Sequence, residues 1–180
     1  MVRILHLSDL HLDTPFKGLV VAAPDLRKRL VSATDLALQR AVTLALELRR
    51  QGRLDAVTIA GDLFDQASPS LRARSHLSAM LRRLCETGLR CFIVAGNHDP
   101  IDDDAVMWRR EVIFPEGARL FGADWEVDFL EANGRRTCAV FGRSFSRAAD
   151  NREPLAGLDR AVALAGQVPI RVGLLHADLG

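Results

Sequence analysis

The sequence predicts an α/β fold in the form of a mixed-sheet sandwich. Two observations carry this prediction. In the first half of the chain, strand-like and helical patterns alternate in the order β-α-β-α-β, which favours parallel strands joined by right-handed crossovers. In the second half, Asn133-Gly134 lies between two strand-like runs and predicts an antiparallel hairpin. A chain of 180 residues fits one domain over residues 1–180.

The first half contains three predicted strands. Each is a short run rich in β-branched, aromatic or leucine side chains, and each stops at a polar or glycine-containing turn. These strands are expected over residues 2–7, 55–60 and 90–95. Because helical segments separate them, we expect all three strands to lie parallel in one sheet.

Two predicted helices connect these strands. Apolar residues at helical spacing mark residues 34–50, and Gly52 follows as a C-terminal stop. The second helix is expected to begin with Ser68 as its N-cap and Pro69 in its first turn, and to stop at Gly88. The side chains expected to face inward are Leu38, Val42, Ala45 and Leu48 in the first helix and Leu77, Met80, Leu81 and Leu84 in the second.

The pattern changes in the second half of the chain. Strands are expected over residues 125–130 and 137–142, on either side of the Asn133-Gly134 turn. A helix is expected near residues 155–165, and a last strand over residues 170–175. The hairpin makes this part at least partly antiparallel, so the sandwich as a whole is predicted to be mixed.

Composition and charge exclude several classes of protein. Apolar residues make up 48% and charged residues 26%, which is ordinary for a globular protein and argues against disorder. A net charge of +1 gives no overall attraction to nucleic acid or membrane. No stretch suits a membrane span or a signal peptide, so we expect a cytoplasmic protein. Cys85, Cys91 and Cys138 are predicted to be free core thiols.

Polar side chains follow four of the predicted strands, each at the strand's carboxyl end. Asp9 and His11 follow the first strand, and Asp62 and Asp65 follow the second. Asn97, His98 and Asp99 follow the third, and His176 follows the last. In α/β sheets such residues meet at a common rim, where sites form. Carboxylates, imidazoles and an amide suit Mn²⁺, Fe²⁺ or Zn²⁺ better than Ca²⁺. The alternative is that the Asp, Asn and Gly residues only form turns and cap helices; the occurrence of all the motifs together favours a metal site.

The order D-x-H, G-D-x-x-D, G-N-H-D and a late histidine resembles the calcineurin-like metallophosphoesterases over essentially the whole chain. Residues 8–13 and 60–65 are most similar to DNA-repair exonucleases of the SbcD type, and residues 12–19 resemble a bacterial YhaO-like branch. The resemblance implies an α-β-β-α sandwich with a mixed sheet. It also implies two divalent ions, with Mn²⁺ expected first and Fe²⁺, Zn²⁺ or Mg²⁺ as alternatives.

The resemblance assigns the metal ligands residue by residue. Asp9 and His11 would bind the first ion. Asp62 would bridge both ions, and Asn97 and His176 would bind the second. Such a pair of ions activates water for in-line attack on phosphorus and neutralises the phosphate oxygens.

The same resemblance assigns catalytic roles to two residues that do not bind metal. His98 would face the scissile phosphate and stabilise or protonate the leaving oxygen. A hydrogen bond from Asp65 would orient it. Asp99 is expected to support the site or to form the turn, without binding metal.

The function implied first is that of a metal-dependent nuclease, a DNA exonuclease in repair, with DNA as substrate. A coiled-coil ATPase of the SbcC type is the implied partner, and no membrane is expected to take part. A homodimer is a further possibility that the sequence does not decide. The alternative is a phosphodiesterase or phosphatase acting on a nucleotide or another small phosphoester. Gln66 and Asp99 differ from the phosphoprotein phosphatases, and a chain without tyrosine is excluded from the purple acid phosphatases.

The chain departs from the family pattern at one point. The family closes its site with a G-H-x-H segment after the late histidine, and the sequence ends at Gly180 without that segment. We expect a domain truncated before its last ligand motif, which binds metal poorly and is inactive alone. The alternative is a non-catalytic remnant of the fold.

Two charged clusters are expected to have simpler roles. Asp102-Asp103-Asp104 is predicted to be a solvated loop at a helix start, although a cation site is the alternative. Arg27-Lys28-Arg29 is the basic cluster nearest the first strand's active end, where it would be able to contact a nucleic-acid backbone.

Overall fold

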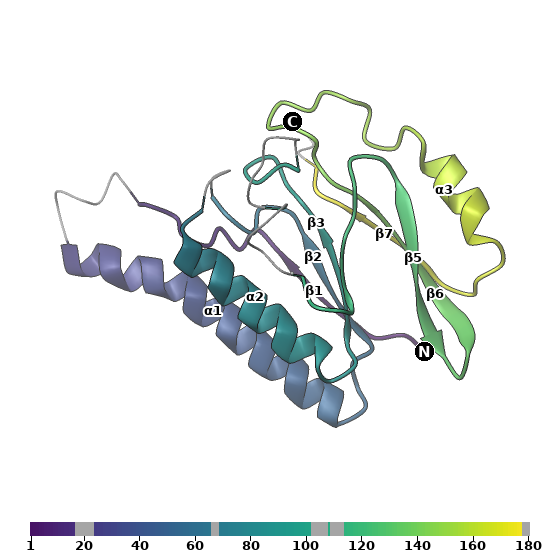
Figure 1. The fold of residues 1–180 in the computed structure, drawn as a ribbon, viewed down its shortest axis with the longest axis horizontal. Helices are drawn as coiled ribbons and strands as arrows, with labels where there is room; N and C mark the ends of the chain where they lie inside the picture. The colour runs from purple at the N-terminus through teal and green to yellow at the C-terminus, as the bar shows by residue number, and fades with distance from the viewer. Residues whose placement is uncertain (17–23, 66–68, 102–107, 109–113, 178–180) are drawn as a thin grey trace.

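A computed structural model of the chain describes residues 1–16, 24–65, 69–101, 108 and 114–177. Over these residues two sheets and three helices form four layers, in the order helix, sheet, sheet, helix (Figure 1). The elements are β1 (Ile4–Ser8), α1 (Pro24–Arg50), β2 (Ala56–Ala60), α2 (Leu71–Cys85), β3 (Arg90–Val94), β4 (Ala118–Leu120), β5 (Glu126–Ala132), β6 (Arg135–Arg143), α3 (Leu158–Ala165) and β7 (Arg171–Leu175). The predicted α/β sandwich is confirmed.

The first sheet is parallel throughout, with strand order β1-β2-β3-β4. Its register pairs Ser8 with Ala60 and Ala60 with Val94, so three strands end at the same level. The loops that follow these strands therefore leave the sheet at one rim. Strand β4 was not predicted, because it has only three residues and little strand pattern of its own.

Helices α1 and α2 lie side by side over one face of the first sheet (Figure 1). The predicted inward side chains of α2 are buried, as are Leu38, Val42 and Ala45 of α1, while Leu48 is partly buried against the same core. Helix α1 begins at Pro24, earlier than expected, because Pro24 and the acidic Asp25 favour a helix start.

The prediction of Ser68 as the N-cap of α2 was wrong. The structure has Ser70 in an extended conformation at this position, and its side chain accepts a hydrogen bond from the Ala73 backbone N–H at 3.2 Å. Pro69 precedes the cap and is buried. Two serines so close together each satisfy the sequence rule for a cap, and Ser68 lies outside the described residues.

The second sheet has the strand order β5-β6-β7, with an antiparallel pair followed by a parallel pair. Asn133 and Gly134 both have positive φ, at 52° and 71°, as the predicted tight hairpin turn requires. Helix α3 covers the outer face of this sheet and starts at Leu158, after Gly157 (Figure 1). Arg143 pairs with Leu175, so β6 and β7 also end at one level.

The two sheets pack on each other through an apolar layer. Phe92 and Val94 from the first sheet meet Val140 and Leu174 from the second, and Phe92 stacks on Phe121 at 6.1 Å. Within the described ranges, the predicted free thiols are confirmed, with Cys91 and Cys138 buried and Cys85 partly buried. In the same ranges, every helix is too short or too polar to cross a membrane.

Candidate metal centre

The loops after β1 and β2 hold each other in place by backbone hydrogen bonds beyond the strands. Asp9 N–H donates to the Gly61 carbonyl at 3.2 Å, and His11 N–H donates to the Asp62 carbonyl at 2.9 Å. Asp9, His11 and Asp62 all have positive φ, at 52°, 44° and 48°. This conformation is unfavourable for residues other than glycine, so the paired loops impose it. It turns three side chains of the predicted ligand set toward one rim.

Two glycines permit the close approach of the remaining loops. A Cβ atom on Gly96 would lie 2.5 Å from the Asp62 backbone nitrogen, and one on Gly61 would lie 2.5 Å from Nδ1 of His176. Real Cβ atoms do not come so close to other atoms. Both positions therefore need glycine if Asp62 and His176 are to keep their places.

Asp9, His11 and Asp62 form one group of possible metal ligands. One donor atom from each lies within 4.8 Å of the others. Nε2 of His11 is 3.8 Å from Oδ2 of Asp62. The Asp62 side chain is only 6% exposed, and its other oxygen accepts a hydrogen bond from the His98 backbone N–H at 3.1 Å.

His176 and Asn97 approach Asp62 from the other side. Nε2 of His176 lies 3.5 Å from Oδ2 of Asp62 and 3.0 Å from Oδ1 of Asn97. Nδ1 of the same ring lies 3.2 Å from the Ala60 carbonyl, and the tautomer that donates to this carbonyl would leave Nε2 as a ligand. Oδ2 of Asp62 therefore stands between the imidazoles of His11 and His176, one from each sheet.

Asp65 and His98 lie at the open side of this group. Oδ1 of Asp65 is 3.1 Å from Nδ1 of His11 and 3.7 Å from Nδ1 of His98. The His98 ring instead approaches the Asp65 backbone carbonyl, at 3.3 Å. His11 and His98 meet edge to face at 5.3 Å. The Asp65 carboxylate thus lies nearer to His11 than to His98, the residue that it was expected to orient.

Asp99 is buried beneath the site and joins two of its loops. Its carboxylate is 0% exposed and accepts hydrogen bonds from the backbone N–H groups of Leu63, Phe64 and Gly96 at 2.8, 3.2 and 2.7 Å. Burial raises the pKa of Asp99 to about 7, although these donors act in the opposite direction. These three hydrogen bonds tie the loop after β2 to the loop after β3, which is the geometry of a support.

The donor set fits divalent cations. Within the described part of the chain, no arginine or lysine nitrogen lies within 4.0 Å of the carboxylates of Asp9, Asp62 or Asp65. Nδ1 of His11 is buried and makes no aligned hydrogen bond. Converging carboxylates and imidazoles without a counter-charge are the arrangement that a bound cation stabilises. Oxygen and nitrogen donors suit Mn²⁺, Fe²⁺ or Zn²⁺.

The structure brings all seven predicted site residues to one rim: Asp9, His11, Asp62, Asp65, Asn97, His98 and His176. The sequence reasoning overlooked Arg143, which ends β6 next to this rim and is 5% exposed. An arginine that closes an otherwise apolar run over residues 138–142 was the available signal. The Asp102-Asp103-Asp104 cluster and the side chains of Arg27 and Lys28 lie outside the described residues.

Comparisons with known proteins identify the family and the fold. The family model described as calcineurin-like phosphoesterase matches residues 2–171. The uncharacterized metallophosphoesterase YhaO of Bacillus subtilis is 29% identical over 180 residues, which is 99% of this chain and 41% of that protein. The crystal structure of TT1561 of Thermus thermophilus superposes with a TM-score of 0.52 at 21% identity, over 100% of this chain and 71% of that one.

A nuclease subunit and a DNA repair protein match the chain in part. SbcD, one of the subunits of the nuclease SbcCD of Escherichia coli, is 31% identical over 100 residues, or 56% of this chain and 22% of that protein. The DNA double-strand break repair protein Mre11 of Saccharolobus solfataricus is 30% identical over 99 residues, which is 55% of this chain and 23% of that protein. The chain spans 22–41% of the length of these three curated relatives. Because the family model matches nearly the whole chain, the chain belongs to the calcineurin-like phosphoesterases.

Proposed function

We propose that this phosphoesterase is a metal-dependent nuclease that hydrolyses phosphodiester bonds of DNA. The observation that carries the proposal is the position of Asp62, whose Oδ2 lies 3.8 Å from the His11 imidazole and 3.5 Å from that of His176. One carboxylate between two separate donor groups is the arrangement that a pair of divalent ions requires. Mn²⁺ is the expected metal.

The residues divide into two ligand groups around Asp62. Asp9 and His11 would hold one ion, and Asn97 and His176 the other. When bound, two such ions neutralise phosphate oxygens and activate the attacking water.

His98 has the position of a group that acts on the substrate. Its side chain is 43% exposed at the open side of the site, while its backbone N–H is anchored to Asp62. A protonated imidazole there would donate to the leaving oxygen as the phosphorus–oxygen bond breaks. The Asp65 backbone carbonyl, 3.3 Å from Nδ1, would hold the ring with Nε2 outward.

DNA as substrate is supported by the partial matches to SbcD and to Mre11, which cover somewhat more than half of this chain. By the same likeness, a coiled-coil ATPase of the SbcC type is the proposed partner. A second candidate is hydrolysis of a small phosphoester, favoured by a cavity of about 290 Å³ beside Asn97 and His176.

The test is hydrolysis of end-labelled DNA and of bis-(p-nitrophenyl) phosphate with Mn²⁺, by this chain and by the same chain with the segment that follows it in its gene. We expect His98→Ala to slow DNA cleavage by roughly 10²- to 10⁴-fold. Mn²⁺ binding should be retained. His76→Ala, on helix α2, is the matched control and should cleave normally.

The outcomes separate the two candidates. Cleavage of the small diester with DNA left intact would remove DNA as substrate and keep the metal chemistry. Full DNA cleavage by His98→Ala would remove His98 from its proposed role. If neither substrate is cleaved although both proteins bind Mn²⁺, the phosphodiesterase proposal fails.

A further inference from the structure

A pocket of about 290 Å³ opens directly beside the metal centre. The connection between β6 and α3 forms one wall, and the ends of β6 and β7 form another. The lining residues that matter are Asn97 and His176 from the metal centre and Arg143, Asp150, Arg152 and Pro154 from the other walls. Its volume is near the lower limit for small-ligand sites, roughly 300 Å³. A ligand there would touch two proposed metal ligands.

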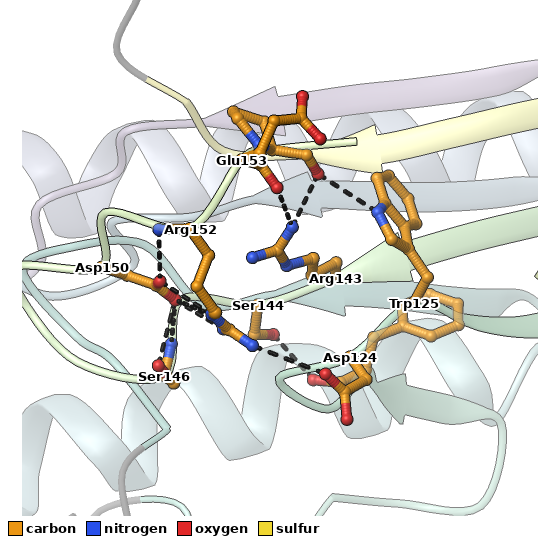
Figure 2. A network of polar contacts seen from close by, with 10 residues as sticks. Asp124, Trp125, Arg143, Ser144, Ser146, Asp150, Arg152 and Glu153 are labelled. Carbon is orange, nitrogen blue, oxygen red and sulfur yellow. Dashed lines mark hydrogen bonds and ion pairs between the residues drawn. The ribbon is translucent and has the colours of Figure 1, made fainter. Parts of the chain in front are cut away.

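Arg143 is a buried cation in the wall of this pocket. It is 5% exposed, and Nη1 donates to the backbone carbonyls of Glu153 and Pro154 at 2.7 and 2.8 Å. In the described part of the chain, no carboxylate lies within 4.0 Å of its guanidinium, in contrast to Arg152. Figure 2 shows dashed lines from only one terminal nitrogen of Arg143.

The other guanidinium nitrogens of Arg143, Nη2 and Nε, have no hydrogen-bond partner among the described residues. Neither nitrogen is among the polar atoms that are both sealed from solvent and unpaired. Two backbone carbonyls therefore position the guanidinium, and its three other N–H donors, one on Nε and two on Nη2, stay available.

Arg152, across the pocket, is already neutralised. Its Nε and Nη2 donate to the Asp150 carboxylate at 2.8 and 2.5 Å, and Nη1 lies 3.5 Å from Asp124 (Figure 2). This guanidinium holds the pKa of Asp150 well below its usual range. Arg143 is thus the lining cation without a counter-ion among the described residues.

The charge and shape of this edge suit a phosphate. A planar guanidinium binds phosphate or carboxylate through two parallel N–H donors, and it does so best where water is partly excluded. A buried cation without a partner is costly, so a bound anion would stabilise it. Because Arg143 pairs with Leu175, it lies one position from His176 across the sheet.

We propose that Arg143 and this pocket form a subsite for a second phosphate of the substrate, next to the phosphate held at the metal centre. The inference rests on the proposed phosphodiesterase function. The second phosphate has two possible sources, the neighbouring diester of a nucleic-acid strand or the terminal monoester of a small phosphoester.

Three chromogenic substrates distinguish the sources. Each is a p-nitrophenyl ester of thymidine 5′-phosphate, with a 3′-hydroxyl, a 3′-phosphate monoester or a 3′-linked second thymidylate. We expect wild-type protein with Mn²⁺ to have a lower KM for the substrates that carry a second phosphate. Arg143→Met should raise the KM for the two substrates with a second phosphate by about 10- to 100-fold. It should change the KM for the 3′-hydroxyl substrate by less than about 3-fold. An effect on the monoester alone points to a terminal phosphate, and an effect on both points to a strand.

Matched variants separate binding from a merely structural role. Arg143→Lys keeps the charge but not the two-pronged geometry, so its KM should lie between those of wild type and Arg143→Met. Arg171→Met is the control, because Arg171 is an exposed strand residue whose Nη2 donates to the Gly166 carbonyl. An equal loss on all three substrates, or no wild-type preference for a second phosphate, would overturn the subsite.

A binding measurement decides the question without turnover. Thymidine 3′,5′-bisphosphate and thymidine 5′-phosphate are titrated by calorimetry, with Mn²⁺ and again with EDTA. Wild type should bind the bisphosphate more tightly, and Arg143→Met should lose that difference. If neither this chain nor its longer form hydrolyses any substrate, the proposed function fails, but Arg143-dependent binding still supports the subsite. Equal binding of the bisphosphate by wild type and Arg143→Met refutes it.

Discussion

Replacing Asp99 with alanine tests whether the buried carboxylate holds the site loops together. Its oxygens accept three backbone hydrogen bonds, from Leu63, Phe64 and Gly96, at 2.7–3.2 Å. The substitution leaves three buried N–H groups without a partner, and each such loss costs about 1–3 kcal/mol. Water entering the vacated space would satisfy some of them. We therefore expect the free energy of unfolding to fall by about 3–5 kcal/mol.

The assay is urea unfolding in EDTA, followed by circular dichroism. With an m-value of about 2 kcal/mol/M, the expected loss lowers the midpoint by about 1.5–2.5 M at constant slope. Asp99→Asn keeps one carbonyl oxygen and should lose less, about 1–2 kcal/mol. Asp159→Ala, in the first turn of α3, is the exposed control and should change stability by less than about 1 kcal/mol. A loss below about 1 kcal/mol for Asp99→Ala would refute this reasoning.

Three further predictions concern the metal centre and its neighbouring loop. Gly96→Ala places a Cβ against Asp62 and should abolish Mn²⁺ binding measured by calorimetry. Gly173→Ala is the control and should bind Mn²⁺ normally, because no atom lies within 4 Å of its added Cβ. Mn²⁺ at a hundred times its Kd should stabilise the wild type by about 2.7 kcal/mol and thereby raise its Tm. The Tm of Asp62→Asn should not rise. Since Arg152 lowers the pKa of Asp150, Asp150→Asn should reduce stability above about pH 4 and progressively less below it, as seen by urea unfolding at several pH values.

Each of these predictions has a contrary result. Wild-type Mn²⁺ affinity in Gly96→Ala would mean that the two loops separate without loss of the site. An equal rise in Tm for Asp62→Asn would place the ion elsewhere. A destabilisation by Asp150→Asn that stays constant from pH 7 to pH 2 would show that the carboxylate acts by packing and not by its charge.

The long elements were predictable because their patterns are local. Three parallel strands, the hairpin at Asn133-Gly134 and the inward stripes of α1 and α2 follow from periodicity and turn chemistry. Strand β4 was missed because three residues carry too little pattern. The start of α1 was missed because the charged residues Asp25 and Arg27-Lys28-Arg29 dominate its first turns and obscure their apolar spacing.

The site was predictable to the level of which residues meet, but not of how they meet. Strand ends placed Asp62 and Asn97 at one rim, since parallel strands in register end together. Which imidazole the Asp65 carboxylate approaches depends on side-chain directions that spacing does not encode. Arg143 was missed because its partners, the carbonyls of Glu153 and Pro154, are on a loop whose path no local pattern specifies.

The position of the site between the two sheets links binding to the packing of the fold. Asp62 and Asn97 follow strands of the first sheet, whereas His176 follows β7 of the second. An ion held by Asp62 and His176 would therefore connect the sheets at their rim, above the apolar layer of Phe92 and Val140. Ligand binding to the folded state alone stabilises it, so part of the metal-binding free energy should oppose separation of the sheets. The same argument applies to the Arg143 pocket, since Asn97, which follows β3 of the first sheet, and Arg143, which ends β6 of the second, both line it.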